Sequence, residues 1–499
     1  MLFNSHIFIF LLLPVCIAGY YILQGRQKNL AKSWVILCSL CFYGYYDIRF
    51  LLLLVLSVLA TYGICKWLQK ETKTGRRKWI LALGVLVNLL PLLYFKYTDF
   101  FLTVSNQFFK TEFSLLNLAL PLGISFFTFQ QIFFIADYYR KEEVDCSFRD
   151  YLQFAFFFPK MAQGPIVTQK EMMPQLAAMG EKKAETSNLV QGICSFVLGL
   201  AKKMLLADTF GRAVEFGYSD ISALTSLDAV IVILSYTFQL YFDFSGYCDM
   251  ADGISRMLGI TLPLNFNSPY KAYNIIDFWK RWHITLTRFF TRNVYIPLGG
   301  NRRGKLRMYC NFLLVFLLSG FWHGAGFTFI LWGLMHGVLY LLTKMWYERF
   351  PVKDGEKTFF TGLKKCVGVT GTFLFVNIAW VYFRAATVTD ANLLLCRLFS
   401  GVAAPLKGIT ESFQLEEVWY ILKILHLTDF SFSSYILIAV FFIVAFVLVF
   451  AGKNVRQLTT KENIEKRVMN PLYGIMMAVL FVWCVVSITG LDSFLYVNF

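Results

Sequence analysis

Charged residues are scarce in this sequence. They make up 16% of its 499 residues, whereas a soluble domain carries about 25%. Hydrophobic residues make up 57%, and phenylalanine alone occupies 53 positions. Most of the chain must therefore face lipid or the interior of a helical bundle, which excludes an ordinary soluble globular protein.

Acidic residues are the scarcer charged class, with 31 Asp and Glu against 47 Lys and Arg, which gives a net charge of +16. A nucleic-acid-binding protein would gather its basic residues on a soluble domain, and no polar stretch here is long enough to form one. A membrane protein places them in its cytoplasmic loops. We therefore expect membrane lipid as a partner and no nucleic acid.

Apolar runs predict an all-α, polytopic membrane protein that forms a single domain over residues 1–499. A crossing helix needs about 20 mostly apolar residues. Candidate spans lie at residues 5–23, 33–46, 50–66, 79–95, 114–136, 189–206, 228–247, 309–323, 325–343, 366–385, 433–451 and 470–490. The runs at 33–46 and 309–323 look too short to cross alone. The expected number of crossing helices is about 11 or 12, with re-entrant or interfacial helices in addition.

Basic clusters follow the first, third, fifth, ninth and eleventh predicted spans. If the chain crosses at each span, these loops share one side, which the positive-inside bias assigns to the cytoplasm. Both termini would then be extracytoplasmic. The chain shows no inverted repeat of the kind that many transporters contain.

Two stretches lack the pattern of an ordinary span. Residues 151–176 are aromatic and then broken by proline and glycine, and residues 262–307 are rich in Trp, Arg and Pro. Non-helical backbone at membrane depth is tolerated only when protein surrounds it or when it lines a wet cavity. Re-entrant or interfacial elements are expected at both places.

Histidine is also scarce, with five residues, three of which lie in one region at His283, His323 and His336. An ionisable side chain inside a membrane is costly and is a functional candidate by default. His323 is flanked by glycines, which would let a substrate approach the backbone closely. A buried histidine that only bonds a carbonyl is the alternative. A metal site is disfavoured, because separations of 40 and 13 residues match no compact metal motif.

These histidines suit acyl transfer to a hydroxyl group. The attacking hydroxyl must lose its proton to a base, and imidazole has a suitable basicity. We predict His323 as this base and His283 as the second catalytic residue, which would orient the base or stabilise the oxyanion. Arg281 and Trp282 would help to shape the site.

Four further residues are candidates for lining the substrate path: His336, Trp322, Asp243 and Ser245. Asp243 belongs to a run of carboxylates that also contains Asp249 and Asp252, at the cytoplasmic end of a predicted span. Such carboxylates could act as acid and base, or bind a cation. We favour a third role, in which they pair with Arg and Lys from residues 270–307 and lock the bundle.

A basic segment between Lys271 and Arg307 is expected to face the cytoplasm. It could attract an anionic acyl donor, such as coenzyme A or an acidic carrier protein. It could equally bind anionic lipid headgroups. The sequence leaves both interpretations open.

Several segments between about residues 120 and 340 carry motifs in a characteristic order. They are Pro121–Gln130 with Asp137–Arg140, Phe158–Pro165, Phe242–Tyr247, Asn265–Tyr270, Asp277–His283, Tyr295–Asn301, and Gly320–Gly326 with Trp332–Gly333 and His336–Gly337. In these motifs the chain resembles the bacterial alginate O-acetylation branch of the membrane-bound O-acyltransferase (MBOAT) family. It departs from that pattern at Lys160 and Gln163.

The resemblance implies a ring of helices around a tunnel that crosses the membrane. An acyl donor, acetyl-CoA or an acylated carrier, would enter from the cytoplasm, and the acyl group would leave on the outer side, with no bound cofactor and no metal. The resemblance gives the catalytic role to His323 and the second active-site role to His283. It also implies a separate extracytoplasmic partner of the acyltransferase or esterase type.

We therefore expect an acyltransferase of the bacterial inner membrane that O-acetylates a polysaccharide of the cell envelope. Transfer of a D-alanyl or a longer acyl group is the alternative within the enzyme class, since the D-alanyl transfer protein of teichoic acid modification is a close cousin of this branch. A transporter that makes no bond is the alternative outside it.

Overall fold

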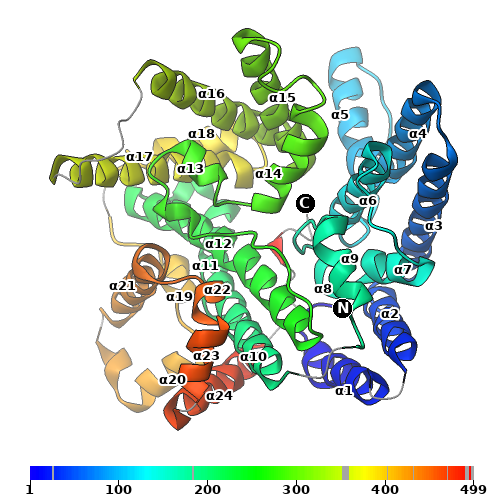
Figure 1. Cartoon of the computed structure of the whole chain (residues 1–499). Helices are drawn as coiled ribbons and strands as arrows, with labels where there is room; N and C mark the ends of the chain where they lie inside the picture. The colour runs from blue at the N-terminus through cyan, green and yellow to red at the C-terminus, as the bar shows by residue number, and fades with distance from the viewer. Residues whose placement is uncertain are drawn as a thin grey trace.

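Helices form all of the regular secondary structure in the part of the chain that the structure describes. This computed structural model describes residues 1–24, 27–181, 185–350, 359–401, 403–430, 432–468, 470–488 and 494–495. Figure 1 shows the helices arranged around the centre of the molecule, and no strand occurs among the described residues. The predicted all-α architecture is confirmed.

The first third of the chain lies on one side of the molecule, blue to cyan in Figure 1. It contains α1 (Leu13–Gln24), α2 (Lys28–Gly44), α3 (Ile48–Lys70), α4 (Thr74–Leu92), α5 (Thr98–Phe109) and α6 (Ile124–Arg140), with the π-helical turns η1 (Phe8–Leu12) and η2 (Leu93–Tyr97). Every residue of α6 from Ile124 to Tyr138 is buried, so α6 is the inner helix of this group.

The predicted span at residues 114–136 is wrong at its start. The helix α6 begins only at Ile124, and residues 110–121 have no helix. The carboxylate of Asp99 in α5 accepts hydrogen bonds from the backbone N–H groups of Leu116 (2.7 Å) and Asn117 (2.9 Å). These bonds hold an apolar segment as a loop, which hydropathy alone does not distinguish from a helix.

Residues 151–176 are divided among short helices inside the protein, as predicted for a broken element. These are α7 (Phe148–Phe156), α8 (Phe158–Met161) and α9 (Gln169–Ala177). Within residues 151–169 every residue except Leu152 is buried. Pro159 lies in the first turn of α8, where the absence of a backbone N–H has no cost.

Two central helices pack in backbone contact. This region contains α10 (Thr186–Ala201), η3 (Lys202–Ala207), α11 (Asp208–Ser219), η4 (Ile221–Ala223) and α12 (Ser226–Met257). A Cβ atom on Gly192 would lie 2.6 Å from the carbonyl oxygen of Gly253, and one on Gly199 would lie 2.6 Å from that of Gly246. Glycine is therefore required for α10 and α12 to approach this closely.

The second irregular stretch and the C-terminal part complete the molecule. Residues 262–307 contain η5 (Pro269–Lys271), α13 (Ile275–Trp279), α14 (Ile284–Phe290) and η6 (Thr291–Tyr295). After these come α15 (Lys305–His323), α16 (Phe327–Arg349), α17 (Phe359–Arg384), α18 (Val388–Arg397), α19 (Lys407–Ser412), α20 (Glu416–Ile424), η7 (Leu427–Asp429), α21 (Ser433–Phe446), η8 (Val447–Ala451), α22 (Val455–Leu458), α23 (Lys461–Val468) and α24 (Pro471–Val486).

Seven helices in the described part of the chain are long and apolar enough to cross a membrane, or eight if one bent pair near the C-terminus is a single span. The chain is thus a multi-pass membrane protein. The count is lower than the predicted 11 or 12, because several apolar runs form shorter helices. The run at 33–46, for example, lies in α2, which has 17 residues and is shorter than the ~20 that a crossing needs.

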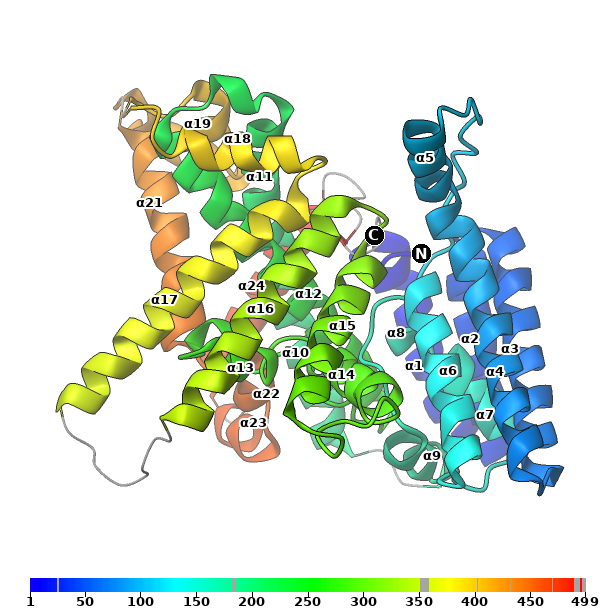
Figure 2. The ribbon, with the colours of Figure 1, turned by 90° about the horizontal axis from the view of Figure 1, so that it is seen from above.

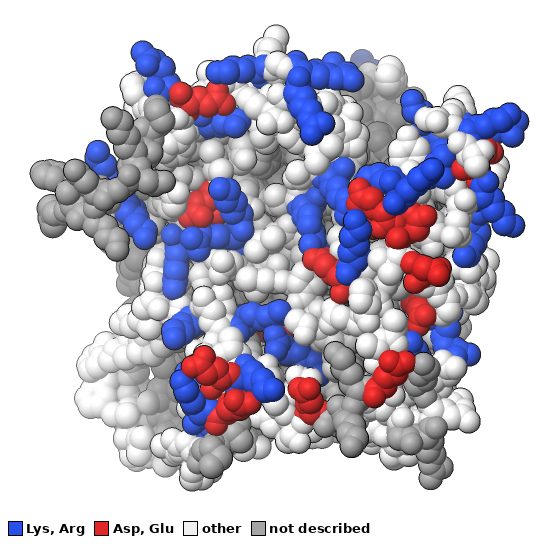
Figure 3. All heavy atoms as spheres, in the orientation of Figure 1, with Lys and Arg blue, Asp and Glu red and all other residues white. Residues whose placement is uncertain are grey.

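The basic loops that the structure describes share one side, as predicted. The turns after α3, α6 and η8 lie at the same end of the bundle (Figure 2). Figure 3 looks onto this end and shows Lys and Arg side chains gathered over it. We call this end, formed by these turns together with α9, α13 and α14, the basic face. Its assignment to the cytoplasm stays a prediction.

Candidate functional site

The two histidines predicted to be catalytic meet in the interior. Their ring centroids lie 6.5 Å apart, although 40 residues separate His283 and His323 in the sequence. His283 directly precedes α14 and His323 is the last residue of α15. Their exposed fractions are 0% and 2%. The fold therefore assembles a buried histidine pair from two elements distant in sequence.

A side-chain amide orients His283. Its Nδ1 lies 3.2 Å from Oδ1 of Asn265, which also accepts a hydrogen bond from Oγ1 of Thr285 (2.9 Å). Because Oδ1 is an acceptor, we assign the imidazole hydrogen to Nδ1, which leaves Nε2 with a lone pair. Nε2 is buried and has no hydrogen-bond partner among the described residues. His283 is thus held with one nitrogen available to accept a proton.

The backbone at His283 is strained. Its φ of 45° and ψ of 50° lie in the left-handed region, which costs a non-glycine residue about 1–3 kcal/mol. Strain of this kind persists only where the surrounding structure determines it, and such positions cluster at functional sites. The imidazole orientation is therefore set by packing and hydrogen bonds rather than by local preference.

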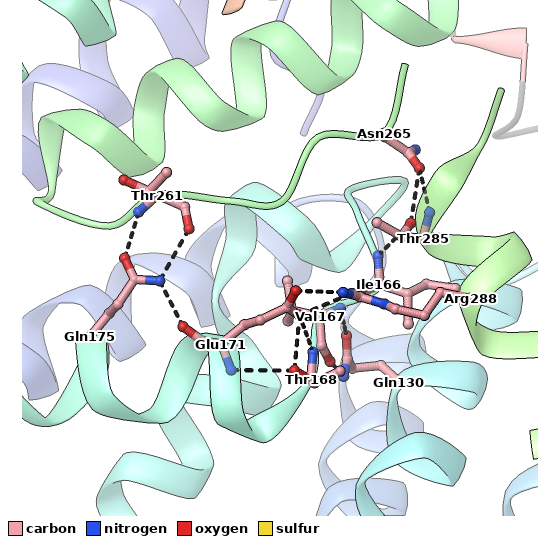
Figure 4. A network of polar contacts seen from close by, with 10 residues as sticks. All are labelled: Gln130, Ile166, Val167, Thr168, Glu171, Gln175, Thr261, Asn265, Thr285 and Arg288. Carbon is pink, nitrogen blue, oxygen red and sulfur yellow. Dashed lines mark hydrogen bonds and ion pairs between the residues drawn. The ribbon is translucent and has the colours of Figure 1, made fainter. Parts of the chain in front are cut away.

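A polar network, drawn in Figure 4, joins the two irregular stretches and includes Asn265, the partner of His283. Thr285 accepts a hydrogen bond from the backbone N–H of Ile166 (3.1 Å), and the Arg288 guanidinium forms an ion pair with Glu171 at the start of α9. Burial alone would raise the pKa of Glu171, but hydrogen bonds from Arg288 and Thr168 bring its pKa below the ordinary value. The ionised carboxylate thus fixes residues 262–288 against residues 165–175.

A half-buried lysine holds the end of α15 that carries His323. Nζ of Lys96, in η2, donates hydrogen bonds to the backbone carbonyl oxygens of Trp322 (2.6 Å) and His323 (3.0 Å). The last carbonyl groups of a helix lack intrahelical partners and carry a partial negative charge, so a cation is favourable there. Lys96 therefore fixes the position of the backbone of the predicted base.

Replacing Lys96 with methionine should lower acyl transfer about tenfold to a hundredfold. Each hydrogen bond from a charged donor contributes about 1.5–3 kcal/mol, and the substitution removes two that position His323. The measurement is the transfer rate in membranes that contain equal amounts of folded protein. Lys70→Met, at the exposed end of α3, is the matched control. An unchanged rate in Lys96→Met would contradict this role.

The glycines near His323 serve helix packing rather than the open approach that the sequence suggested. A Cβ atom on Gly324 would lie 2.1 Å from the ring of Phe329, and one on Gly320 would lie 2.3 Å from the Phe329 carbonyl oxygen. A Cβ atom on Gly333 would lie 2.4 Å from the carbonyl oxygen of Phe316. The glycines therefore allow α15 and α16 to pack in close contact.

His336 is separated from the histidine pair by the ring of one tryptophan, Trp332. The ring of Trp332 stands between them, 5.2 Å from the His323 ring and 4.9 Å from the His336 ring. His336 is fully buried and also contacts Trp279 and Phe375, each at 5.2 Å between ring centroids. Neither of its ring nitrogens has a hydrogen-bond partner in the described chain. A substrate contact by His336 stays a prediction.

The aromatic and basic candidates divide into two groups. Trp322 contacts both histidine rings, at 4.7 Å from His323 and 6.2 Å from His283, and so belongs to the site. Trp282 is buried and packs against other rings, including Trp380 at 5.0 Å. Arg281 forms an ion pair with Asp277 (2.9 Å) and is about a third exposed. The structure does not bring Trp282 or Arg281 to the histidine pair.

The carboxylates of α12 are paired, as predicted, but the predicted source of their partners is wrong. Asp243 pairs with Lys203 (2.9 Å), and Asp249 pairs with Lys202 (2.6 Å). Both lysines belong to η3 and not to residues 270–307, because the close packing of α10 on α12 brings η3 alongside. Asp252 pairs with Arg256 and Arg456. Ser245 accepts a hydrogen bond from Lys202 (3.3 Å).

A polar cleft leads from the basic face toward His283. Its lining includes Lys202, Tyr241, Ser245, Cys248, Asp249, Asp252, Asn265, Phe266, Asn454 and Arg456. The inner end is Asn265, the hydrogen-bond partner of His283. The outer end is formed by residues that follow η8, at the face where Lys and Arg gather (Figure 3). The cleft holds only about 30 Å³ and reaches Asn265 but neither histidine, so a route to the histidine pair and a continuous tunnel across the membrane both stay predictions.

The basic segment at 271–307 is only partly available to an anionic ligand. Arg288 pairs with Glu171, Arg292 pairs with Asp137, and Lys305 pairs with Glu348. Among the described residues, no group of three or more His, Cys, Asp or Glu side chains is placed to hold a metal ion. Donor attraction and lipid binding by this segment both stay predictions.

Sequence reasoning assigned no role to two residues of the site, Asn265 and Lys96. Asn265 begins one of the recognised motifs, but no local pattern indicates that its amide meets a histidine 18 residues later. Lys96 is a basic residue at the end of a long apolar run. A charge in that position is a functional candidate, and this signal could have identified it.

Comparison with known proteins identifies the family of the chain. The family model of the membrane-bound O-acyltransferases matches residues 36–385. The chain is 43% identical over 423 residues to a peptidoglycan O-acetyltransferase of Helicobacter pylori, which covers 79% of each chain. It is 36% identical over 410 residues to a probable alginate O-acetylase of Pseudomonas aeruginosa, covering 80% of this chain and 75% of that one.

A more distant relative is named for a different activity. The chain is 28% identical over 354 residues to a teichoic acid D-alanyltransferase of Bacillus subtilis, which covers 68% of this chain and 87% of that protein. The family match includes both histidines of the pair and most of the helices that enclose them. The chain therefore belongs to the membrane-bound O-acyltransferase family and is an O-acyltransferase.

Proposed function

We propose that this protein moves an acetyl group across the bacterial inner membrane for O-acetylation of a cell-envelope polysaccharide. The observation that supports this most strongly is the buried pair of His283 and His323, whose hydrogen-bond partner Asn265 lines a polar cleft. The similarity to proteins named as O-acetyltransferases of envelope polymers, at 43% and 36% identity, supports acetyl as the acyl group.

The proposed reaction is attack by a hydroxyl group on the carbonyl carbon of a thioester donor. His323 removes the hydroxyl proton as the new C–O bond forms, the C–S bond breaks, and the proton passes to the leaving thiolate. His283 supports this step, because its Nε2 has no hydrogen-bond partner among the described residues and its ring lies beside Trp322, which also contacts His323. The donor is acetyl-CoA or an acetylated carrier that approaches from the basic face, where net positive charge would attract it.

The orientation of the protein in the membrane determines on which side the acceptor and the partner must lie. If the basic face is cytoplasmic, the acyl group must leave on the opposite side to reach a polymer of the envelope. A separate extracytoplasmic protein of the acyltransferase or esterase type would complete the transfer. D-alanyl transfer is the second candidate, and it ranks lower because the relatives with that name are only 28% identical.

Ester analysis of the cell envelope tests the proposal. A deletion strain receives either the wild-type gene or an empty vector, and mild base releases ester-linked groups from purified envelope polysaccharides. We expect acetate to be released only from the strain with the gene, and equal D-alanine from both. If both strains released equal acetate and only the strain with the gene released D-alanine, the protein would transfer D-alanyl groups and not acetyl groups.

A further inference from the structure

An apolar crevice separates α21 from the central helices. It has a volume of about 390 Å³, which is within the ~300–1,000 Å³ of typical small-molecule sites. Its walls are aliphatic and aromatic side chains from η3, α12, α21, η8, α22 and α24, including Leu205, Leu206, Phe242, Val440, Val444, Leu448, Leu458 and Leu480. The crevice is distinct from the polar cleft but shares Lys202, Tyr241 and Asn454 with it.

The helix α21 is tied to the protein mainly at its ends and on one side. Near its start, Ser434 accepts a hydrogen bond from Gln414 (3.1 Å), and beyond its end Gly452 accepts one from Lys271 (2.7 Å). One side packs against aromatic rings, as in the contact of Phe442 with Phe210 at 5.3 Å. Figure 1 shows α21 at the edge of the molecule, and its span is only 22% buried.

Another face of α21 lines the crevice. The residues Leu437, Val440, Phe441, Val444 and Leu448 follow the spacing of one helical face and all contribute to the lining. Side chains of the described protein do not fill the space. Water is disfavoured there because an apolar cavity offers it few hydrogen-bond partners. In a membrane the available apolar filler is a lipid acyl chain, which would restore the lost dispersion contacts.

The crevice has a polar end at the basic face. Lys453 and Asn454 lie two and three residues after the end of η8, and Ser268 and Lys202 complete this end. Lys453 is exposed and has no ion pair among the described residues. A phosphate group placed here would meet an ammonium group and neutral donors, while the chain attached to it would extend along the apolar walls.

We propose that this crevice binds an anionic phospholipid of the leaflet at the basic face. One acyl chain lies between α21 and the wall formed by η3, α12 and α24, and the phosphate contacts Lys453. The bound lipid also supports the shared residues Lys202, Tyr241 and Asn454, and so stabilises the entrance of the polar cleft. This inference does not depend on the identity of the transferred acyl group.

Native mass spectrometry of the full chain tests the proposal, with phosphatidylglycerol and phosphatidylethanolamine of equal chain length as probes. We expect one phosphatidylglycerol to bind at least about tenfold more tightly than phosphatidylethanolamine. Val444→Trp, which fills the crevice, should abolish this tight binding. Lys453→Glu should reduce the preference for phosphatidylglycerol to less than about twofold.

Ile443→Trp is the matched control, because Ile443 neighbours Val444 but is not part of the crevice lining and is 61% exposed. It should bind phosphatidylglycerol as the wild type does. If Val444→Trp does not fold, Lys453→Glu, a surface substitution, still decides the outcome. Equal binding of the two lipids by the wild type would overturn the proposal. Displacement of bound phosphatidylglycerol by palmitoyl-CoA at equal concentration would also overturn it and would assign the crevice to a long-chain acyl donor.

Discussion

Replacing His323 with alanine should reduce acyl transfer at least about 100-fold while leaving the amount of folded protein unchanged. General acid–base catalysis by a positioned side chain contributes about 10²–10⁴-fold, and His323 is buried beside His283 with its backbone held by Lys96. The substitution removes the imidazole but keeps the backbone carbonyl that Lys96 binds, so the end of α15 should keep its position.

The measurement is the ester-linked acetate of the envelope polysaccharides in a deletion strain that carries each variant at matched expression. His6→Ala, a substitution of the same type at an exposed position, should retain full activity. His283→Ala should also lose most activity if the two histidines act together. If the His323→Ala variant gave wild-type acetate levels, His323 would not be the catalytic base. His283 would then be the next candidate for that role.

Replacing Lys203 with methionine should destabilise the folded protein by about 3–5 kcal/mol, the cost of leaving an uncompensated buried charge. Lys203 pairs with Asp243 (2.9 Å) and Asp208 (2.7 Å), and its side chain is 3% exposed. Without the ammonium group, two carboxylates lie close together in the interior. Because Asp243 also accepts a hydrogen bond from the backbone N–H of Leu495 (3.0 Å), the packing of the C-terminal segment should weaken too.

Thermal unfolding of the purified protein in detergent measures this effect. Adding Asp243→Asn to Lys203→Met should recover part of the loss, because one buried charge is removed. Lys466→Met is the control, since its ion pair with Glu462 is exposed (71% and 78% of the two side chains) and such pairs contribute about 0–1 kcal/mol. If Lys203→Met unfolded at the wild-type temperature, these contacts would not stabilise the fold.

The features that depend on local sequence were predicted well. Long apolar runs marked α12, α16 and α21, and the basic loops after α3, α6 and η8 lie on one side as expected. Proline and aromatic content at residues 151–176 indicated a broken element, and the structure has three short helices there. In each case a property of neighbouring residues decides the local structure, so the sequence carries the information directly.

The predictions that were wrong concern features that depend on contacts between separate segments of the chain. The apolar residues before Ile124 form a loop because Asp99 binds their backbone N–H groups, and hydropathy does not include such a bond. The partners of Asp243 and Asp249 come from η3 because glycines bring α10 against α12. The histidine pair was expected from the family resemblance, whereas its hydrogen bond to Asn265 became visible only in three dimensions.

The glycine contacts between α10 and α12 also limit how the protein can move. Gly192 and Gly199 meet Gly253 and Gly246 at backbone distance, so sliding or rotating one helix against the other would drive main-chain atoms into collision. The two helices must therefore travel as one rigid body during turnover. Asn265 and the η3 lysines lie against this body, so one wall of the polar cleft keeps its shape. Any gating motion must come from weakly attached elements such as α21.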